Sequence, residues 1–192
     1  MDRRRRGASG ALLVGLWVAL TVAGAAAEDL AEPDDVAFEV GPFQVLGNGP
    51  HRFAIGGGVF DFRRVGGKEK YDGGPRAEGR VEAYSGTKLW IFAPMAGVLV
   101  NHDGGVYGWG GASIDIALGN LHLTPALGLG GYDEGDSKDL GGVFQFYTGG
   151  TVSYVVAPAV RVGITLGHIS NAYIHDDNPG EESLLLTLVF AP

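Results

Sequence analysis

Cysteine does not occur in the 192-residue chain, so the sequence offers no disulfide, no thiolate metal ligand and no cysteine nucleophile. Positive charge is scarce as well. Lys and Arg number 14 against 22 Asp and Glu, and the net charge of −8 provides no basic footprint for nucleic acid. The apolar segments are not separated by amphipathic helical stripes of useful length, which argues against a fold of alternating strands and helices.

Glycine and proline, in contrast, are abundant, with 34 and 9 residues. Both residues break helix interiors, so this composition argues against a helical bundle. The chain is nonetheless 45% hydrophobic and only 19% charged, which is typical of a folded protein rather than a disordered one. We therefore expect one all-β domain of ordinary size.

The N-terminus has the pattern of a secretory signal peptide. Four arginines at 3–6 precede an apolar run over 11–22, and three alanines at 25–27 precede Glu28. A charged, an apolar and a small-residue region in this order predict cleavage after Ala27. The alternative, a single membrane-anchoring helix, is less favoured because the apolar run is short. Residues 1–27 are thus predicted to direct export of the protein.

The rest of the chain is expected to form a short lead-in and eight strands. Residues 28–50 are acidic and contain Gly-Pro pairs, so we interpret them as an irregular periplasmic lead-in with at most one short helix or strand. Within 51–192, apolar or alternating runs are separated by turn residues. The predicted strands are 52–63, 77–86, 88–100, 105–118, 121–132, 142–156, 159–171 and 182–190.

The connections between these runs alternate in length. Short turns are predicted at 85–87, 119–120 and 157–158. Polar connections, three of them long, are predicted near 64–76, 101–104, 133–141 and 172–181. Short turns at one end and longer loops at the other are typical of bacterial outer-membrane barrels, whose short turns lie in the periplasm. The sequence therefore predicts an eight-stranded antiparallel transmembrane β-barrel in the outer membrane.

Alternation along the strands supports this prediction. In 160–166 and 184–190 the even positions are apolar, and in 161–167 the odd positions are polar or small. A soluble barrel would turn the apolar face inward, whereas a membrane barrel turns it to lipid; the signal peptide and the loop lengths favour the second. Polar side chains are then expected to form a network in a lumen too narrow for a channel: Arg80, Glu82, Asp115, His122 and Arg161.

One set of residues carries chemistry. By parity, His168 and Ser170 share the apolar, outward face near the end of their strand, and Glu182 lies on the same face at the start of the next. Adjacent antiparallel strands place these positions side by side. A hydroxyl, an imidazole and a carboxylate within reach of one another have the logic of a serine hydrolase triad, with His168 as base and Glu182 as its orienting partner. The alternative is that they are ordinary polar residues at the barrel rim.

The same segment resembles the lipid A 3-O-deacylase (PagL) family. Its motif has a histidine, a serine two residues on and a glutamate fourteen residues after the histidine, as His168, Ser170 and Glu182 have here. Glycine-rich stretches at 103–108 and 138–142 also look like the family. The resemblance implies an outer-membrane enzyme that hydrolyses the ester-linked acyl chain at the 3 position of lipid A. Its partners would be lipopolysaccharide and the surrounding membrane lipid.

The resemblance also implies an oxyanion or supporting role for Asn171, together with a backbone N–H near Tyr173, where family members commonly have glycine. No cofactor or metal is expected, because a serine nucleophile needs no metal-activated water. Two other functions remain open: a non-catalytic small outer-membrane barrel, and an esterase of the same fold that acts on another lipid.

Other features are weaker signals. Acidic loop clusters could hold a divalent cation, but neither has a full calcium-loop spacing, and solvated loops are the favoured interpretation. They comprise His175, Asp176 and Asp177 in one loop, and Asp133, Glu134, Asp136 and Asp139 in another. Several aromatic residues are candidates for an interfacial girdle or for ordinary packing: Trp90, Trp109, Tyr107, Tyr132 and Tyr154.

Overall fold

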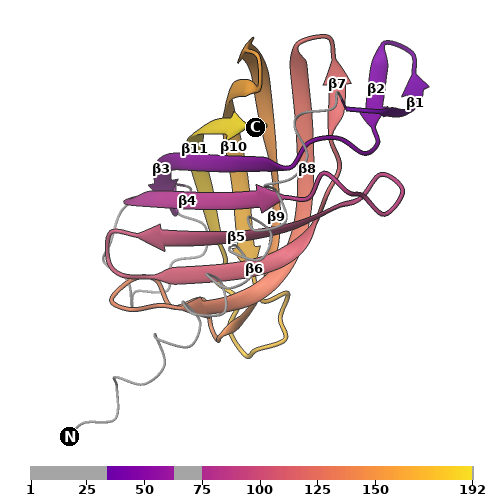
Figure 1. Cartoon of the computed structure of the whole chain (residues 1–192). Helices are drawn as coiled ribbons and strands as arrows, with labels where there is room; N and C mark the ends of the chain where they lie inside the picture. The colour runs from indigo at the N-terminus through magenta and orange to yellow at the C-terminus, as the bar shows by residue number, and fades with distance from the viewer. Residues whose placement is uncertain (1–33, 63–74, 192) are drawn as a thin grey trace, which may run out of the picture.

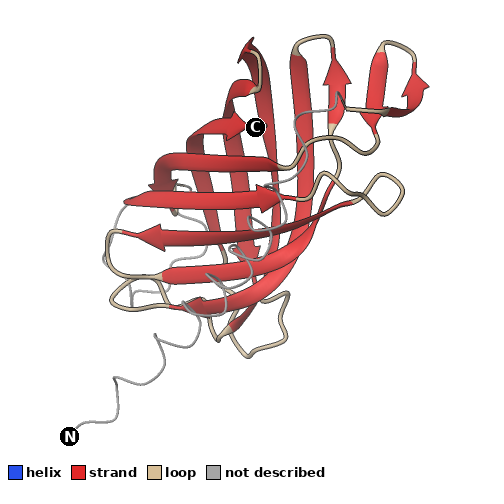
Figure 2. Ribbon diagram, viewed as in Figure 1, coloured by secondary structure: helices blue, strands red, loops and turns tan. Residues whose placement is uncertain are grey.

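The computed structural model describes residues 34–62 and 75–191. The regular secondary structure in these ranges consists of β-strands alone (Figure 2). The predicted signal peptide at 1–27 lies outside the described residues. The strands are β1 (Val36–Val40), β2 (Phe43–Leu46), β3 (Arg52–Phe60), β4 (Arg76–Tyr84), β5 (Ala93–Asn101), β6 (Val106–Ser113), β7 (Ile116–Leu118), β8 (Leu121–Asp133), β9 (Phe144–Ala157), β10 (Val160–Ser170) and β11 (Glu181–Phe190). No helix within these residues is long and apolar enough to cross a membrane.

Eight of the strands form a closed antiparallel barrel. Around the wall the order is β3, β4, β5, β6, β8, β9, β10 and β11, and β11 pairs back with β3. β7 continues β6 after a short break, and both pair with β8. The prediction of an eight-stranded antiparallel barrel is confirmed, and the strand bounds differ from the predicted runs by a few residues at most positions.

The two ends of the barrel differ in their connections (Figure 1). At one end, here called the turn end, strands are joined through 85–92, 119–120 and 158–159. At the other, the loop end, the connections are 61–75, 102–105, 134–143 and 171–180, of which 63–74 lie outside the described residues. The expected asymmetry is present, although the 85–92 connection is longer than the three-residue turn predicted there.

The two faces of the wall follow the alternation of the sequence. On β10 and β11 the paired residues Leu166 and Leu184 are 54% and 39% exposed, whereas Thr165 and Leu185, also paired, are 1% exposed each. Exposed apolar side chains continue around the other strands, where they form a belt that a membrane interior would solvate. This belt includes Ile55, Val81, Val100, Leu127, Leu129, Val152, Ile164, Leu186 and Leu188.

The lumen is filled by side chains. Trp109 stacks between Tyr107 and Tyr147, with ring centroids 5.2 and 4.9 Å away. Gly97 makes room for this ring, because a Cβ there would lie 2.3 Å from the Trp109 side chain. Of the five aromatic residues considered for a girdle, Tyr107, Trp109 and Tyr132 are therefore interior packing residues. Trp90 and Tyr154 are exposed, at 72% and 52%.

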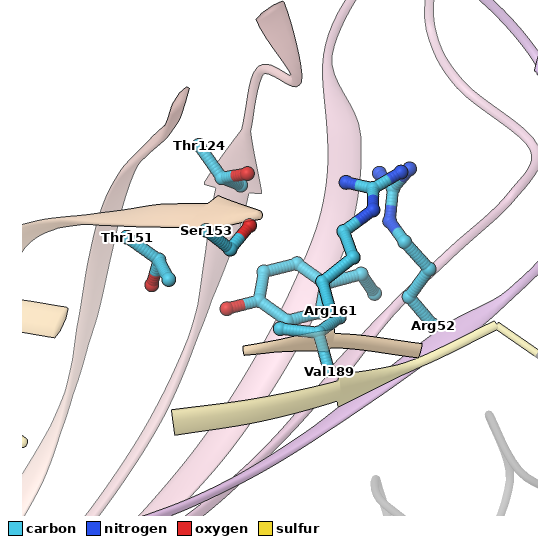
Figure 3. Close-up of a pocket in the computed structure, with 7 residues that line it drawn as sticks. Arg52, Thr124, Thr151, Ser153, Arg161 and Val189 are labelled. Carbon is cyan, nitrogen blue, oxygen red and sulfur yellow. The ribbon is translucent and has the colours of Figure 1, made fainter. Parts of the chain in front are cut away.

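The predicted interior polar residues are buried, but they form two groups rather than one. Near the turn end, Arg52 and Arg161 both donate to Asp115 Oδ2, at 2.7 and 2.8 Å. Figure 3 shows these two arginines beside a cavity of about 10 Å³, room for roughly one water molecule. His122 lies against the same aspartate, with Nδ1 3.3 Å from Oδ1. The second group, around Arg80, lies nearer the loop end.

Residues 36–46 differ from the expected irregular lead-in. They form a hairpin in which Val40 pairs with Phe43 across a two-residue turn, Gly41-Pro42. Gly41 has φ +60, a conformation that glycine adopts without strain, so the Gly-Pro pair makes a tight turn rather than an interruption. β2 then pairs with β7, and in Figure 1 the hairpin stands beside β7 at the turn end.

Candidate active site

His168, Ser170 and Glu182 lie on the outward face of the wall, at the loop end of β10 and β11. His168 and Glu182 are direct Cα partners in the antiparallel pair. Ser170, the last residue of β10, lies opposite Phe146 of β9. Side chains two positions apart on a strand point to the same side, about 7 Å apart along it. The imidazole therefore shares the outward face with a carboxylate directly across on β11 and with a hydroxyl two positions further along β10.

The imidazole and the carboxylate are in contact. His168 Nδ1 lies 3.5 Å from Glu182 Oε1, and the two side chains are 44% and 23% exposed. This distance is longer than that of a normal hydrogen bond, and such contacts often tighten only when substrate is bound. Glu182 meets Nδ1, so Nε2 is the ring nitrogen that this carboxylate does not engage.

Gly180 forms one wall of the histidine site. It is buried and has φ +57, where a side chain would be strained. A Cβ at this position would also lie 3.1 Å from Cε1 of His168. Two independent constraints therefore favour glycine here, and the second places the backbone of the 171–180 connection directly against the imidazole.

Asn171, next to Ser170, joins two connections of the loop end through its side chain. Its side chain is fully buried and donates through Nδ2 to the carbonyl oxygens of Leu140 (2.8 Å) and Asp177 (2.7 Å). Its Oδ1 accepts the N–H of Tyr173 at 2.9 Å. These bonds tie the 134–143 connection to the 171–180 connection and hold the chain immediately after Ser170.

The backbone after Ser170 has two consecutive residues in the left-handed region, Ala172 (φ 52) and Tyr173 (φ 61). Residues other than glycine adopt this region uncommonly, and they do so where surrounding contacts impose it. Tyr173 is 79% exposed, so its side chain does not supply those contacts. Its N–H and the Asn171 amide, the donors that the family resemblance suggests for an oxyanion, are bonded within the loop in this structure.

A second polar group lies behind the site, inside the barrel. Glu181 is fully buried and accepts a hydrogen bond from the Asp61 N–H at 3.3 Å. Its Oε1 also lies 3.1 Å from Ser183 Oγ. Ser183 Oγ also lies 2.5 Å from Glu78 Oε2, and Glu78 pairs with Arg80 at 2.8 Å. The alternation that turns Glu182 outward thus turns Glu181 into this buried group, whose other members sequence reasoning did not connect with the site.

The acidic loops use their carboxylates to shape turns. Asp139 Oδ1 accepts the Gly141 N–H at 2.7 Å, and Asp133 Oδ1 accepts the Gly135 N–H at 3.1 Å. The ring of His175 packs on Gly142, where a Cβ would lie 2.4 Å from it. Within the described residues, no group of three or more His, Asp or Glu side chains is placed to hold a metal ion.

The closed eight-stranded antiparallel barrel with its apolar outer belt places the protein among bacterial outer-membrane β-barrels. Comparison with protein families makes this specific. The model described as lipid A 3-O-deacylase (PagL) matches residues 78–191, and the chain belongs to this family. The matched range contains His168, Ser170 and Glu182, and it begins after the β1–β2 hairpin.

A solved structure shares the fold of this chain. The crystal structure of the outer membrane enzyme PagL matches with a TM-score of 0.54 and 15% identity, over 73% of this chain and 98% of that chain. The Yersinia pestis outer membrane protein Ail matches with a TM-score of 0.46 and 11% identity, over 74% of this chain and 99% of that chain. A search of curated proteins found no match.

Proposed function

We propose that the protein is an outer-membrane serine esterase that removes the ester-linked 3-hydroxyacyl chain from the 3 position of lipid A. The observation that carries the proposal is the outward His168–Glu182 pair, with Ser170 on the same face of β10. Membership of the lipid A 3-O-deacylase family supports the substrate class. An imidazole and a carboxylate in contact on a lipid-facing wall are costly unless they have a role there.

In this proposal His168 takes the proton of Ser170 while Oγ attacks the ester carbonyl carbon. The tetrahedral intermediate collapses, the sugar 3-oxygen leaves with the proton from His168, and the acyl chain remains on Ser170. A water molecule, deprotonated by His168, then attacks the acyl-enzyme and releases a 3-hydroxy fatty acid. Glu182 is a positioning residue that holds the imidazole through Nδ1 and stabilises its charged form.

We assign Asn171 a supporting role. Its amide holds the backbone after Ser170 through the Leu140 and Asp177 carbonyls. A direct contribution to the oxyanion requires the amide, or the Tyr173 N–H that it accepts, to exchange a bond within the loop for one to substrate. We propose that lipid binding, which replaces water around this exposed edge, triggers that exchange.

The outward position of the site fits a substrate that lies in the membrane. β10 runs toward the loop end, so the site lies near one membrane boundary, where a lipid carries its acyl esters. We propose that this end faces the cell exterior. A peptide tag within 171–180 should then bind antibody on intact cells, whereas a tag at 158–159 should not. The reverse pattern would place the site in the other leaflet and contradict lipid A as substrate.

The decisive assay is incubation of the purified protein in detergent with lipid A, followed by mass spectrometry of lipid and released acid. We expect loss of one 3-hydroxyacyl chain from the 3 position, while the amide-linked chains survive because an amine is the poorer leaving group. Ser170→Ala should be inactive, and Ser85→Ala, at the turn end, should remain active.

Two results would contradict the proposal. Release of fatty acid from phospholipid but not from lipid A would indicate an esterase of another lipid. Release from neither, by protein shown to be folded, would indicate a non-catalytic barrel.

A further inference from the structure

The β1–β2 hairpin has one apolar face and one polar face. On the polar face, Gln44 donates to Glu39 at 2.9 Å. On the apolar face, alternation places side chains that are 39–61% exposed, although they belong to residue types that are usually buried. These are Phe38, Val40 and Phe43.

The apolar face of the hairpin continues the lipid-facing face of the barrel. Across the sheet, Phe38 pairs with Val45, Val45 with Ile116 and Ile116 with Leu123, and directly paired residues share a face. Leu123 is 45% exposed on the outer wall. The other face of β2 leads through Ala117 to the buried His122.

The neighbouring connection adds exposed rings. Leu89 and Trp90, in 85–92, are 74% and 72% exposed, and Phe92 is 43% exposed. The ring of Trp90 lies 6.3 Å from that of Phe38 and 6.1 Å from that of Phe92. Lys88, in the same connection, ties it to the hairpin because Nζ donates to the Leu46 carbonyl at 2.9 Å. The hairpin and residues 89–92 thus present one apolar surface, rich in aromatic rings.

We propose that this surface, formed by the apolar face of β1–β2 with residues 89–92, is an interfacial anchor that lies in the phospholipid leaflet at the turn end. Phospholipid is the occupant that the strand register favours, since the surface is continuous with the apolar outer wall of the barrel. Trp90 is an aromatic side chain with one polar edge, a type that is favoured at the boundary between headgroups and acyl chains. The inference depends on the barrel lying in a membrane and is independent of the enzymatic activity.

The anchor lies at the opposite end of the barrel from the candidate active site. The hairpin lies outside the region matched by the family model, whereas residues 89–92 lie inside it. Widening the apolar wall at one end resists movement of the barrel along the membrane normal. The anchor would thereby fix the depth at which His168, Ser170 and Glu182 meet the other leaflet.

The experiment uses the natural lack of cysteine, which allows single cysteines to be labelled with a polarity-sensitive fluorophore. Val40→Cys and Phe43→Cys report on the apolar face. Glu39→Cys and Gln44→Cys are matched controls on the polar face of the same strands, and Leu186→Cys reports on the barrel wall. The mature chain would be refolded into vesicles of phosphatidylethanolamine and phosphatidylglycerol, with or without acyl chains that carry a quencher, and each variant would be checked for folded mobility in an unheated gel.

We expect the Val40 and Phe43 labels to be quenched by lipid carrying a shallow quencher and to be protected severalfold from aqueous iodide relative to the Glu39 and Gln44 labels. Equal exposure of both pairs to iodide would overturn the proposal. Protection that appears only at high protein-to-lipid ratio, with crosslinking between copies through β1, would also overturn it in favour of a second copy of the chain, because β1 has a free edge within the described residues.

Discussion

Two polar groups lie on opposite faces of the wall at the start of β11, and they differ in how many of their polar atoms have hydrogen-bond partners. Inside, Glu181 is fully buried among Ser183, Glu78 and the Asp61 N–H. Outside, the next residue, Glu182, is partly exposed and meets His168 at 3.5 Å. Two adjacent glutamates are thus separated by strand alternation alone into a structural role and a proposed catalytic one.

The difference indicates which substitutions should affect stability and which should affect activity. Buried polar groups must be paired, because an unpaired charge in the interior is costly. The outward group is held by few contacts and remains accessible from the membrane, as a group that must meet substrate requires. If this division is correct, variants on the two sides of one strand should have separable effects.

The largest effect is expected outside, at the proposed nucleophile and base. Ser170→Ala or His168→Ala should lower kcat by about 10⁶-fold, because each removes a group that the mechanism cannot replace. The barrel should still fold, which an unheated gel would show. Substantial deacylation of lipid A by folded Ser170→Ala protein would show that Ser170 is not the nucleophile.

The adjacent glutamates provide the most direct test of the comparison. Glu182→Ala should lower kcat less than loss of the nucleophile, by about 10⁴-fold, because an orienting carboxylate is the least costly triad member to lose. Glu181→Ala should retain most of the activity and change the unfolding temperature instead. Measured kcat and unfolding temperature for both variants would decide, and a greater loss of kcat in Glu181→Ala would mean that the outward carboxylate is wrongly assigned.

Inside the barrel, the charge of Arg80 is expected to be essential for stability. Arg80→Met leaves the buried Glu78 without its ion-pair partner and should destabilise the protein by about 3–5 kcal/mol. Arg76→Met, on the same strand, removes a more exposed pair with Asp103 and should cost at most about 1 kcal/mol. Denaturant unfolding in detergent measures both, and equal losses would contradict the structural importance of the interior group.

A smaller effect is expected where the backbone touches the imidazole. Gly180→Ala should lower kcat by about tenfold, since a Cβ 3.1 Å from His168 moves the ring by a few tenths of an ångström and such misplacement is costly to catalysis. Gly119→Ala is the matched control, because Gly119 has φ +58 and nothing within 4 Å. Both variants carry the same backbone strain, so only a difference in kcat between them reports on the histidine contact.

The smallest effect is expected from chelation of divalent ions. A side-chain nucleophile needs no metal-activated water, so EDTA should leave kcat unchanged at saturating lipid A. It can raise KM, because divalent ions bridge the phosphates of the substrate. Initial rates over a range of lipid A concentrations separate the two parameters, and a fall in kcat would assign the metal a part in the chemical step.

Strand positions and faces could be predicted from the sequence because alternation and turn residues are local signals. The same parity predicted the common face of His168, Ser170 and Glu182. The hairpin at 36–46 was missed because its stabilising partner, β7, lies about 70 residues further along the chain, and Gly41-Pro42 was interpreted as an interruption.

Contacts between distant residues could not be predicted in the same way. The bond from Ser183 to Glu78 spans 105 residues, and the packing of Gly180 on the imidazole depends on the path of a whole loop. The aromatic residues of β6 illustrate an intermediate case. Tyr107 and Trp109 share one parity on their strand, but the sequence left open whether they belong to an interfacial girdle or to ordinary packing, and the structure places them in the lumen.

The closure of the barrel has a consequence for biosynthesis. β11 is the last strand of the chain and pairs with β3, the first strand of the barrel wall. Glu182 lies on this last strand, and the loop that holds Ser170 depends on the connection before β9. The proposed site therefore comes into being only when β11, the last strand of the described residues, has paired with β10. A chain whose β11 has not yet been added lacks the Glu182 partner of His168, so the order of the strands would confine the proposed hydrolytic activity to a protein that has completed this pair.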